Sequence, residues 1–217
     1  MSGSELQLIT GSTDGHIAVW DLTPSIKPYF GLGGRSIKRR DDVPFPAEPV
    51  SIKWGDRRTA HQSSIKAMEL LPLPGAQVLL ITGGDDNCLA FSTLRFSESS
   101  TSGPCPSLIS RFSTVSYPNA HASAINAICQ VRCIEHGADK RMVGFLVASS
   151  GNDQRIKLWS ALVDSIDGDV QVSLQGDMYT AVADLSAIDQ FTVQASGQDR
   201  EYLVLCGVGM EMWDVCT

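Results

Sequence analysis

The sequence of 217 residues has no long apolar run and no leader-like start. No window holds 18 consecutive apolar residues, and residues 1–10 lack a basic segment followed by an apolar one. Membrane helices need the first feature, and secretory leaders need the second. We therefore expect a cytoplasmic protein that does not bind a membrane. The chain is still 43% hydrophobic, which is enough to fill a substantial core.

The cysteines are few and scattered. The six are Cys88, Cys105, Cys129, Cys133, Cys206 and Cys216. The nearest two, Cys129 and Cys133, have no second pair at zinc-ligand spacing. Because free cysteine in proteins is most often buried, we interpret all six as buried or incidental thiols and expect no metal site.

Signatures of catalysis are also missing. The sequence has no glycine-rich nucleotide loop between a strand and a helix, no paired carboxylates at an exposed site and no HExxH metal pattern. We therefore predict a protein that is not an enzyme and takes no cofactor and no small-molecule substrate.

Positive charge is scarce, since 17 basic residues face 24 acidic ones and the net charge is -7. This argues against a chain that binds nucleic acid over its whole surface, because phosphate binding needs a positively charged surface. The one basic cluster consists of Arg35, Lys38, Arg39 and Arg40, followed at once by two aspartates. Such charge runs usually form solvated loops. If RNA is bound at all, these four residues are the best candidates.

An internal repeat dominates the rest of the sequence. Residues 8–20, 80–92 and 147–159 align without a gap. Each holds an apolar run, a turn that contains aspartate and an alternating apolar run, which together predict a β-hairpin. A fourth copy, residues 202–214, keeps the strands and Trp213 but shortens the turn and lacks the aspartate.

A further strand precedes three of these hairpins, in residues 61–68, 121–128 and 184–191. Each begins with a polar residue, here called the lead residue: His61, His121 and Asp184. The repeating unit is therefore a lead residue, an inner strand and a hairpin. Residues 49–54 and 108–112 are expected to form outer strands.

This unit resembles the WD-repeat family, in which a histidine precedes the first strand and Trp-Asp ends the third, as in Trp20-Asp21 and Trp213-Asp214. The resemblance implies an all-β propeller of about four blades, near residues 6–54, 61–112, 121–175 and 184–215. The turn aspartates are spaced more widely than the roughly 40–45 residues of an ordinary repeat. Residues 23–49 and 97–120 are therefore expected to be inserted loops.

We also expect this propeller to be incomplete. The first unit begins at its second strand and the last stops after its third. The chain would then be the C-terminal piece of a longer propeller or the product of a truncated gene model. Open strand edges favour aggregation, so we expect the chain to be poorly soluble when it is expressed alone.

In the family, four side chains of each unit form one hydrogen-bonded network. The third copy has His121, Ser149, Asp153 and Trp159; the second has His61, Thr82 and Asp86 with Ser92 in place of tryptophan; the first has Thr10, Asp14 and Trp20. A histidine, a serine and an aspartate together also suggest a hydrolytic triad. Recurrence of the trio inside packed blades favours a structural role. Catalysis by Cys129 or His121 is disfavoured because neither has partners beyond this network.

Finer features suggest a function. Residues 61–65, 121–122, 152–159, 182–185 and 206–213 resemble the C-terminal part of the eukaryotic WD-repeat partner subunits of the tRNA wobble-ribose 2′-O-methyltransferase. The resemblance implies a scaffold that binds this enzyme and helps to position tRNA, while the enzyme carries S-adenosylmethionine and the catalytic residues. The alternative is a general WD-repeat adaptor, either a ubiquitin-ligase substrate receptor or a signalling scaffold, that binds peptides near the hairpin turns and the inserts.

Overall fold

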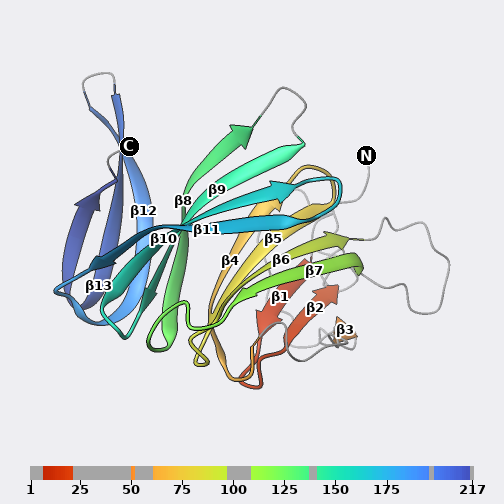
Figure 1. Cartoon of the computed structure of the whole chain (residues 1–217), viewed down its shortest axis with the longest axis horizontal. Helices are drawn as coiled ribbons and strands as arrows, with labels where there is room; N and C mark the ends of the chain where they lie inside the picture. Colours follow the sequence, from red (N-terminus) through yellow and green to blue (C-terminus); the bar gives the residue numbers. More distant parts are fainter. Residues whose placement is uncertain are drawn as a thin grey trace, which may run out of the picture.

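The regular structure is entirely β in the residues that the computed structural model describes, which are 7–21, 50–51, 61–96, 109–136, 141–195 and 198–215. The strands form four antiparallel sheets, and neighbouring strands in each sheet follow one another in the sequence. Figure 1 shows the sheets side by side in sequence order, from β1 and β2 in red to β12 and β13 in blue. Each sheet is therefore a local meander, and the chain builds one sheet after another.

The strands are distributed over the sheets as follows. The first sheet contains β1 (Gln7–Gly11), β2 (Ile17–Asp21) and β3 (Val50–Ser51). The second contains β4 (Ile65–Leu73), β5 (Gln77–Gly84), β6 (Leu89–Phe96) and β7 (Ile109–Tyr117). The third contains β8 (Ile125–His136), β9 (Met142–Gly151), β10 (Arg155–Asp164) and β11 (Val170–Tyr179). The fourth contains β12 (Ala183–Ala195) and β13 (Gln198–Asp214).

The aligned segments form the hairpins that the sequence predicted. Strand β1 pairs with β2, β5 with β6 and β9 with β10, and the expected inner strands β4, β8 and β12 pair with β5, β9 and β13. The turns contain Gly15, Asn87 and Gln154, all with positive φ. Glycine and asparagine adopt this left-handed conformation at little cost, which explains their presence in the first two turns, whereas the glutamine adopts it at a greater cost.

The fourth hairpin lies inside β13. Its turn is so short that the strand assignment is continuous, but the Val215 N–H donates to the Glu201 carbonyl at 2.8 Å. Fourteen residues of extended strand would separate these two groups by roughly 45 Å, so the chain must reverse between them. Gly209, with φ 114°, lies in this stretch. The shortened turn of the fourth copy therefore still returns the chain.

The outer strands are longer than the sequence indicated. Strand β7 continues to Tyr117, well past residue 112, and β11 continues past residue 175. The Ser- and Thr-rich composition of residues 97–120 suggested a loop, yet Thr114, Val115 and Tyr117 pair with β6. β-branched and aromatic residues fit a half-buried strand. Residues 23–49 and 97–108 lie outside the described residues.

In the described part of the chain, three apolar clusters lie between consecutive sheets. The cluster between the first and second sheets is centred on Ile17, Val19, Leu80 and Leu94; that between the second and third includes Phe91, Phe145 and Trp159; that between the third and fourth includes Ile156, Leu185, Ile188, Leu203 and Leu205. The inner strand β8 contacts both β4 and β12. The sheets are therefore stacked in series and packed most closely along their inner strands.

Strand β5 shows why some strands lack the alternating pattern of a one-faced sheet. Leu79 and Ile81 face the third sheet, whereas Leu80 faces the first, and all three are fully buried. A strand covered on both faces reads as a continuous apolar run. Each such side chain contributes roughly 1.5–3 kcal/mol by leaving water.

Side chains also tie the second and third sheets together at the ends of the strands. The Arg95 guanidinium donates to the Ile166 carbonyl and the Gln77 amide to the Ser165 carbonyl, both at 2.8 Å. Thr93 Oγ1 donates to the Gly168 carbonyl at 2.7 Å. The β10–β11 turn is therefore held by the second sheet. Among the described residues, no helix has the length and apolar character to cross a bilayer.

Candidate functional site: the repeated histidine networks

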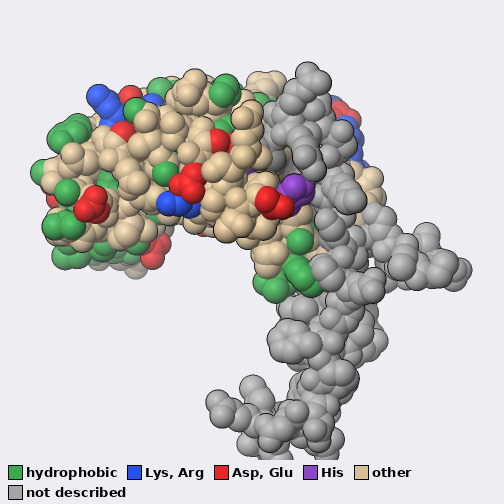
Figure 2. Space-filling model, turned by 90° about the horizontal axis from the view of Figure 1, so that it is seen from below, with side chains coloured by type: hydrophobic (Ala, Val, Ile, Leu, Met, Phe, Trp, Pro, Cys, Tyr) green, Lys and Arg blue, Asp and Glu red, His purple; other side chains and the backbone are tan. Residues whose placement is uncertain are grey.

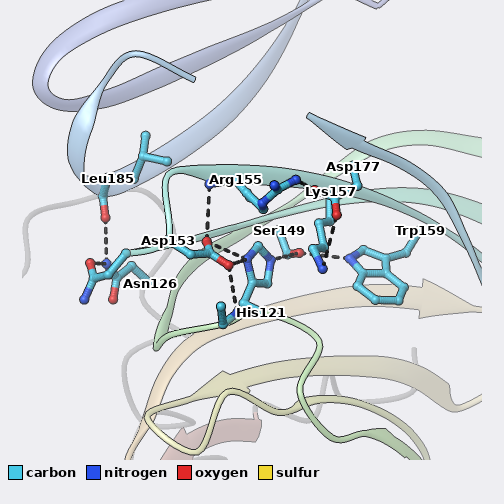
Figure 3. A network of polar contacts seen from close by, with 11 residues as sticks. His121, Asn126, Ser149, Asp153, Arg155, Lys157, Trp159, Asp177 and Leu185 are labelled. Carbon is cyan, nitrogen blue, oxygen red and sulfur yellow. Dashed lines mark hydrogen bonds and ion pairs between the residues drawn. The ribbon is translucent and has the colours of Figure 1, made fainter. Parts of the chain in front are cut away.

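The third sheet brings together His121, Ser149, Asp153 and Trp159 (Figure 3). Trp159 Nε1 lies 2.9 Å from Ser149 Oγ, and this oxygen lies 2.8 Å from His121 Nε2. An indole N–H only donates, so the serine accepts from Trp159. A neutral imidazole that donates from Nδ1 to a carboxylate accepts at Nε2, so the serine donates its own hydrogen to Nε2. His121 Nδ1 then donates to Asp153 Oδ1 at 3.0 Å. The four groups form one directed chain that contains a neutral imidazole.

Asp153 closes the chain at the β9–β10 turn. Its carboxylate also accepts the Ala122 N–H at 2.8 Å and the Arg155 N–H at 3.2 Å. Burial alone would raise the pKa of Asp153, but the hydrogen bond from His121 and those from the two amides hold it below its usual value. Burial lowers the pKa of His121. The network therefore suits a carboxylate beside an uncharged histidine.

The second sheet repeats the arrangement with one member missing. His61 Nδ1 lies 2.9 Å from Asp86 Oδ1, and Nε2 lies 2.9 Å from Thr82 Oγ1. The Gln62 N–H donates to Asp86 at 2.8 Å. Ser92, at the tryptophan position, instead pairs with a threonine hydroxyl of β7. The network therefore ends at Thr82, because a serine is too short to reach it.

One group in this sheet has the composition of a metal site. The ligand atoms of His61, Asp86 and Cys88 lie within 4.8 Å of one another. Both ring nitrogens of His61 already have hydrogen-bond partners, and burial raises the pKa of the Cys88 thiol to about 11. A metal needs a thiolate and a free nitrogen lone pair. The geometry fits a hydrogen-bonded cluster better than a cation.

The first sheet holds only part of the network. Trp20 Nε1 donates to Thr10 Oγ1 at 3.0 Å. Asp14, expected to belong to the same network, does not join it: its carboxylate accepts from the Ser12 hydroxyl and from the His16 N–H. The hydrogen bond from Ser12 is the main cause that lowers the pKa of Asp14 to about 2. The hydrogen bonds of this carboxylate therefore lie within its own turn.

The fourth sheet has a network that the sequence did not reveal. Asp184, expected as the lead residue, is exposed and has φ 48°. Thr180 is buried instead, and its hydroxyl donates to Glu211 Oε2 at 2.7 Å. Trp213 Nε1 donates to the same oxygen at 3.1 Å. In this sheet the carboxylate belongs to a strand residue, Glu211, and not to a turn aspartate. The only sequence feature that points to Glu211 is Trp213, two residues later.

Backbone bonds identify Thr180 as the true equivalent of the lead histidine. The His121 N–H donates to the Asn87 carbonyl at 3.4 Å, and the Thr180 N–H donates to the Gln154 carbonyl at 3.0 Å. Asn87 and Gln154 each follow a turn aspartate and have positive φ. A carbonyl in the turn of one sheet thus accepts a hydrogen bond from the backbone of the lead residue of the next sheet. Asn126 adds a bond from the third sheet to the Leu185 carbonyl, at 2.7 Å.

His121 and Cys129 are poorly placed for catalysis. The His121 side chain is fully buried, and both its ring nitrogens are engaged. Burial raises the pKa of the Cys129 thiol to about 12, whereas a nucleophilic cysteine needs a thiolate. These features suit a structural role for both residues.

The basic residues proposed for RNA contact, Arg35, Lys38, Arg39 and Arg40, lie outside the described residues. Among the residues that the structure describes, most basic side chains have acidic partners at 2.6–3.9 Å: Lys66, Arg132, Arg141, Arg155, Lys157 and Arg200. On the face shown in Figure 2, acidic and basic side chains are interspersed. This part of the surface has little basic character for phosphate binding.

A comparison of the sequence with protein-family models found no match, and a comparison with curated proteins found none either. The functional argument therefore starts from the repeated networks and their geometry.

Acid is expected to weaken the third-sheet network. The pKa of His121 is lower in the folded chain than its ordinary value of 6.5, so the unfolded chain binds the proton first and the free energy of unfolding falls as pH drops below about 6.5. The lowered pKa of Asp153 extends this loss to lower pH. Thermal midpoints at pH 7.5 and 5.5 should differ less in His121→Gln than in the unmodified chain. An equal difference in both proteins would contradict a neutral, buried His121.

Proposed function

We propose that this chain is part of a WD-repeat β-propeller and acts as a non-catalytic scaffold. The observation that carries the proposal is the recurrence of one network, a hydroxyl, a histidine and a carboxylate, in successive antiparallel sheets. The sheets are stacked along their inner strands, as the blades of a propeller would be. Such networks stabilise the sheets and leave their faces and loops for binding.

The partner proposed is a tRNA ribose 2′-O-methyltransferase. The support is the resemblance of residues 61–65 and 206–213 to the WD-repeat subunits that accompany this enzyme. In this arrangement the enzyme supplies S-adenosylmethionine and the reacting groups, and the scaffold orients the tRNA so that the wobble ribose reaches them. Orientation of this kind lowers the barrier by removing rotational freedom before the reaction. The bonds that link consecutive sheets suit a rigid support.

Reconstitution tests this proposal directly. The full chain is mixed with the purified catalytic subunit of a tRNA ribose 2′-O-methyltransferase, and the mass of the complex is measured by light scattering. We expect a stable complex and faster wobble-ribose methylation than with the enzyme alone. No complex and no change in rate would reject the proposal. Retention of purified ubiquitin-ligase components in the same assay would favour the adaptor function.

The contribution of RNA contacts can be measured separately. Neutralising Arg35, Lys38, Arg39 and Arg40 to glutamine should weaken tRNA binding and flatten its salt dependence by up to about 3 in slope, since each phosphate contact contributes roughly 0.7–0.9. The matched control carries the same loss of charge at Lys66, Arg111, Arg155 and Arg200. Equal salt slopes in the unmodified chain and in the first variant would show that the cluster does not contact tRNA.

A further inference from the structure

Gln154 connects the third sheet to the segment that leads into the fourth. Its backbone carbonyl accepts the Thr180 N–H at 3.0 Å, and its side-chain Nε2 donates to the Val182 carbonyl at 3.4 Å. Its side-chain Oε1 accepts from the Tyr179 hydroxyl at 2.9 Å. We call these three hydrogen bonds the Gln154 contacts. They hold three of the four residues from 179 to 182.

The Tyr179 hydroxyl determines how the Gln154 amide is oriented. The Val182 carbonyl can only accept, so it needs Nε2, and Oε1 is left for a group that donates. Tyr179 supplies that donor. A group that only accepts, placed at the same position, would attract Nε2 instead. Oε1 would then face the Val182 carbonyl, and two acceptors without a shared hydrogen do not bind each other.

Tyr179 is accessible at its hydroxyl end. The residue is 64% exposed and lies at the end of β11, the outermost described strand of its sheet. Tyr117 is half-buried and donates to the Val172 carbonyl at 2.8 Å. Tyr202 is half-buried and stacks on Phe191. Among the tyrosines that the structure describes, Tyr179 is therefore the one whose ring lies mostly in solvent.

A cation lies across the strand pair from this tyrosine. Arg155 is paired with Tyr179 in the β10–β11 register, and Lys157 is paired with Asp177. Both cations contact the Asp177 carboxylate, Arg155 at 2.9 Å and Lys157 at 3.6 Å (Figure 3). The Cβ atoms of directly paired residues lie about 5 Å apart, and both Arg155 and Tyr179 have long side chains. An anion at the Tyr179 hydroxyl would therefore have a guanidinium within reach.

We propose that Tyr179 is a phosphorylation site and that its phosphate breaks the side-chain part of the Gln154 contacts. A tyrosine kinase would transfer the γ-phosphoryl group of ATP to the Tyr179 oxygen. The new P–O bond replaces the bond between that phosphorus and ADP, ADP leaves, and the phenolic proton is released. The product carries a charge of about -1.5 to -2 and strong acceptor oxygens in place of the donor. Arg155 would bind this group, as guanidinium binds phosphate elsewhere.

The expected consequence is confined to the start of the fourth sheet. The hydrogen bond between Thr180 and Glu211 does not involve Tyr179, and neither does the apolar cluster around Leu185 and Ile188. The fourth sheet should therefore stay folded while residues 180–182 are held less tightly to the third. This regulation does not depend on the identity of the partner, so the methyltransferase reconstitution can fail without affecting it.

Phosphorylation is tested on the full chain. The chain is incubated with the purified catalytic domain of a tyrosine kinase and Mg·ATP, and the product is mapped by tandem mass spectrometry. We expect a phosphoryl group on Tyr179. Total incorporation should fall in Tyr179→Phe, and the matched control Tyr202→Phe should keep the group on Tyr179. A product without phosphate on Tyr179 would overturn the proposal, whether or not other tyrosines react.

The effect on the Gln154 contacts is measured by hydrogen exchange at the Thr180 N–H. Phosphorylation should speed this exchange about two- to tenfold, the change that corresponds to loss of a typical hydrogen bond. Gln154→Ala removes the same side-chain contacts without phosphate, so it should exchange faster from the start and respond little to phosphorylation. Tyr179→Phe, carried through the same kinase reaction, should show no change on treatment. Equal exchange before and after phosphorylation, or an undiminished response in Gln154→Ala, would overturn the proposal.

Discussion

Replacing Phe91 by alanine should lower the free energy of unfolding by about 3–5 kcal/mol. Phe91 is fully buried between the second and third sheets and lies edge-on to Tyr117, with ring centroids 6.2 Å apart. Truncation removes the apolar area and leaves a cavity that the neighbouring strands cannot fill, because closely packed sheets relax only in part. Urea unfolding followed by circular dichroism gives the loss as a change in midpoint at constant slope.

The matched control is the same substitution at Phe191. This ring is 38% exposed on β12 and stacks on Tyr202, with centroids 5.4 Å apart. Its removal should cost only about 1 kcal/mol, mostly from the lost aromatic contact. Equal losses for the two variants would contradict a core that lies between consecutive sheets.

Replacing His121 by alanine should lower the free energy of unfolding by about 1–3 kcal/mol. The substitution leaves the Asp153 carboxylate, whose side chain is 8% exposed, without its imidazole donor, and it leaves the Ser149 hydroxyl without an acceptor. A cycle with Ser149→Ala separates the network from the loss of volume. Residues that share one network show coupling of about 0.5–3 kcal/mol.

His16→Ala provides the control for this prediction. His16 lies at the turn of the first hairpin, next to Asp14 and outside the third-sheet network. Its removal should change stability by no more than about 0.5 kcal/mol, as for most surface sites. Strictly additive effects of His121→Ala and Ser149→Ala would show that the two side chains act independently.

The sequence was sufficient for the hairpins and for the members of two networks. Alternation of apolar residues and the chemistry of the turns are local properties, so residues 80–92 and 147–159 could be assigned from their own composition. The lead histidines could be assigned because each stands at a fixed distance before its strand. In both cases the residues on which the prediction depends lie within one repeating unit.

The fourth network could not be found in this way. The position of Thr180 is set by the Gln154 carbonyl of the preceding sheet, and Glu211 acts from a strand instead of a turn. Asp184 matched the alignment, but its backbone is left-handed and its side chain is exposed. Likewise Asp14 kept its place in the repeat, but it accepts hydrogen bonds from Ser12 and His16 of its own turn. The position of Thr180, in contrast, depends on a contact with the preceding sheet.

The carbonyls of Asn87 and Gln154 give the molecule a mechanical property. Each accepts a hydrogen bond from the lead residue of the next sheet, so it forms a joint between two consecutive sheets. Angular deviations at joints in series add, so a small rotation at Gln154 moves the fourth sheet relative to the second by an amount that grows with distance from the joint. A partner that contacts two distant sheets would bind surfaces whose separation depends on the angles at these joints. Its binding would then respond to substitutions at the joints, which it does not touch.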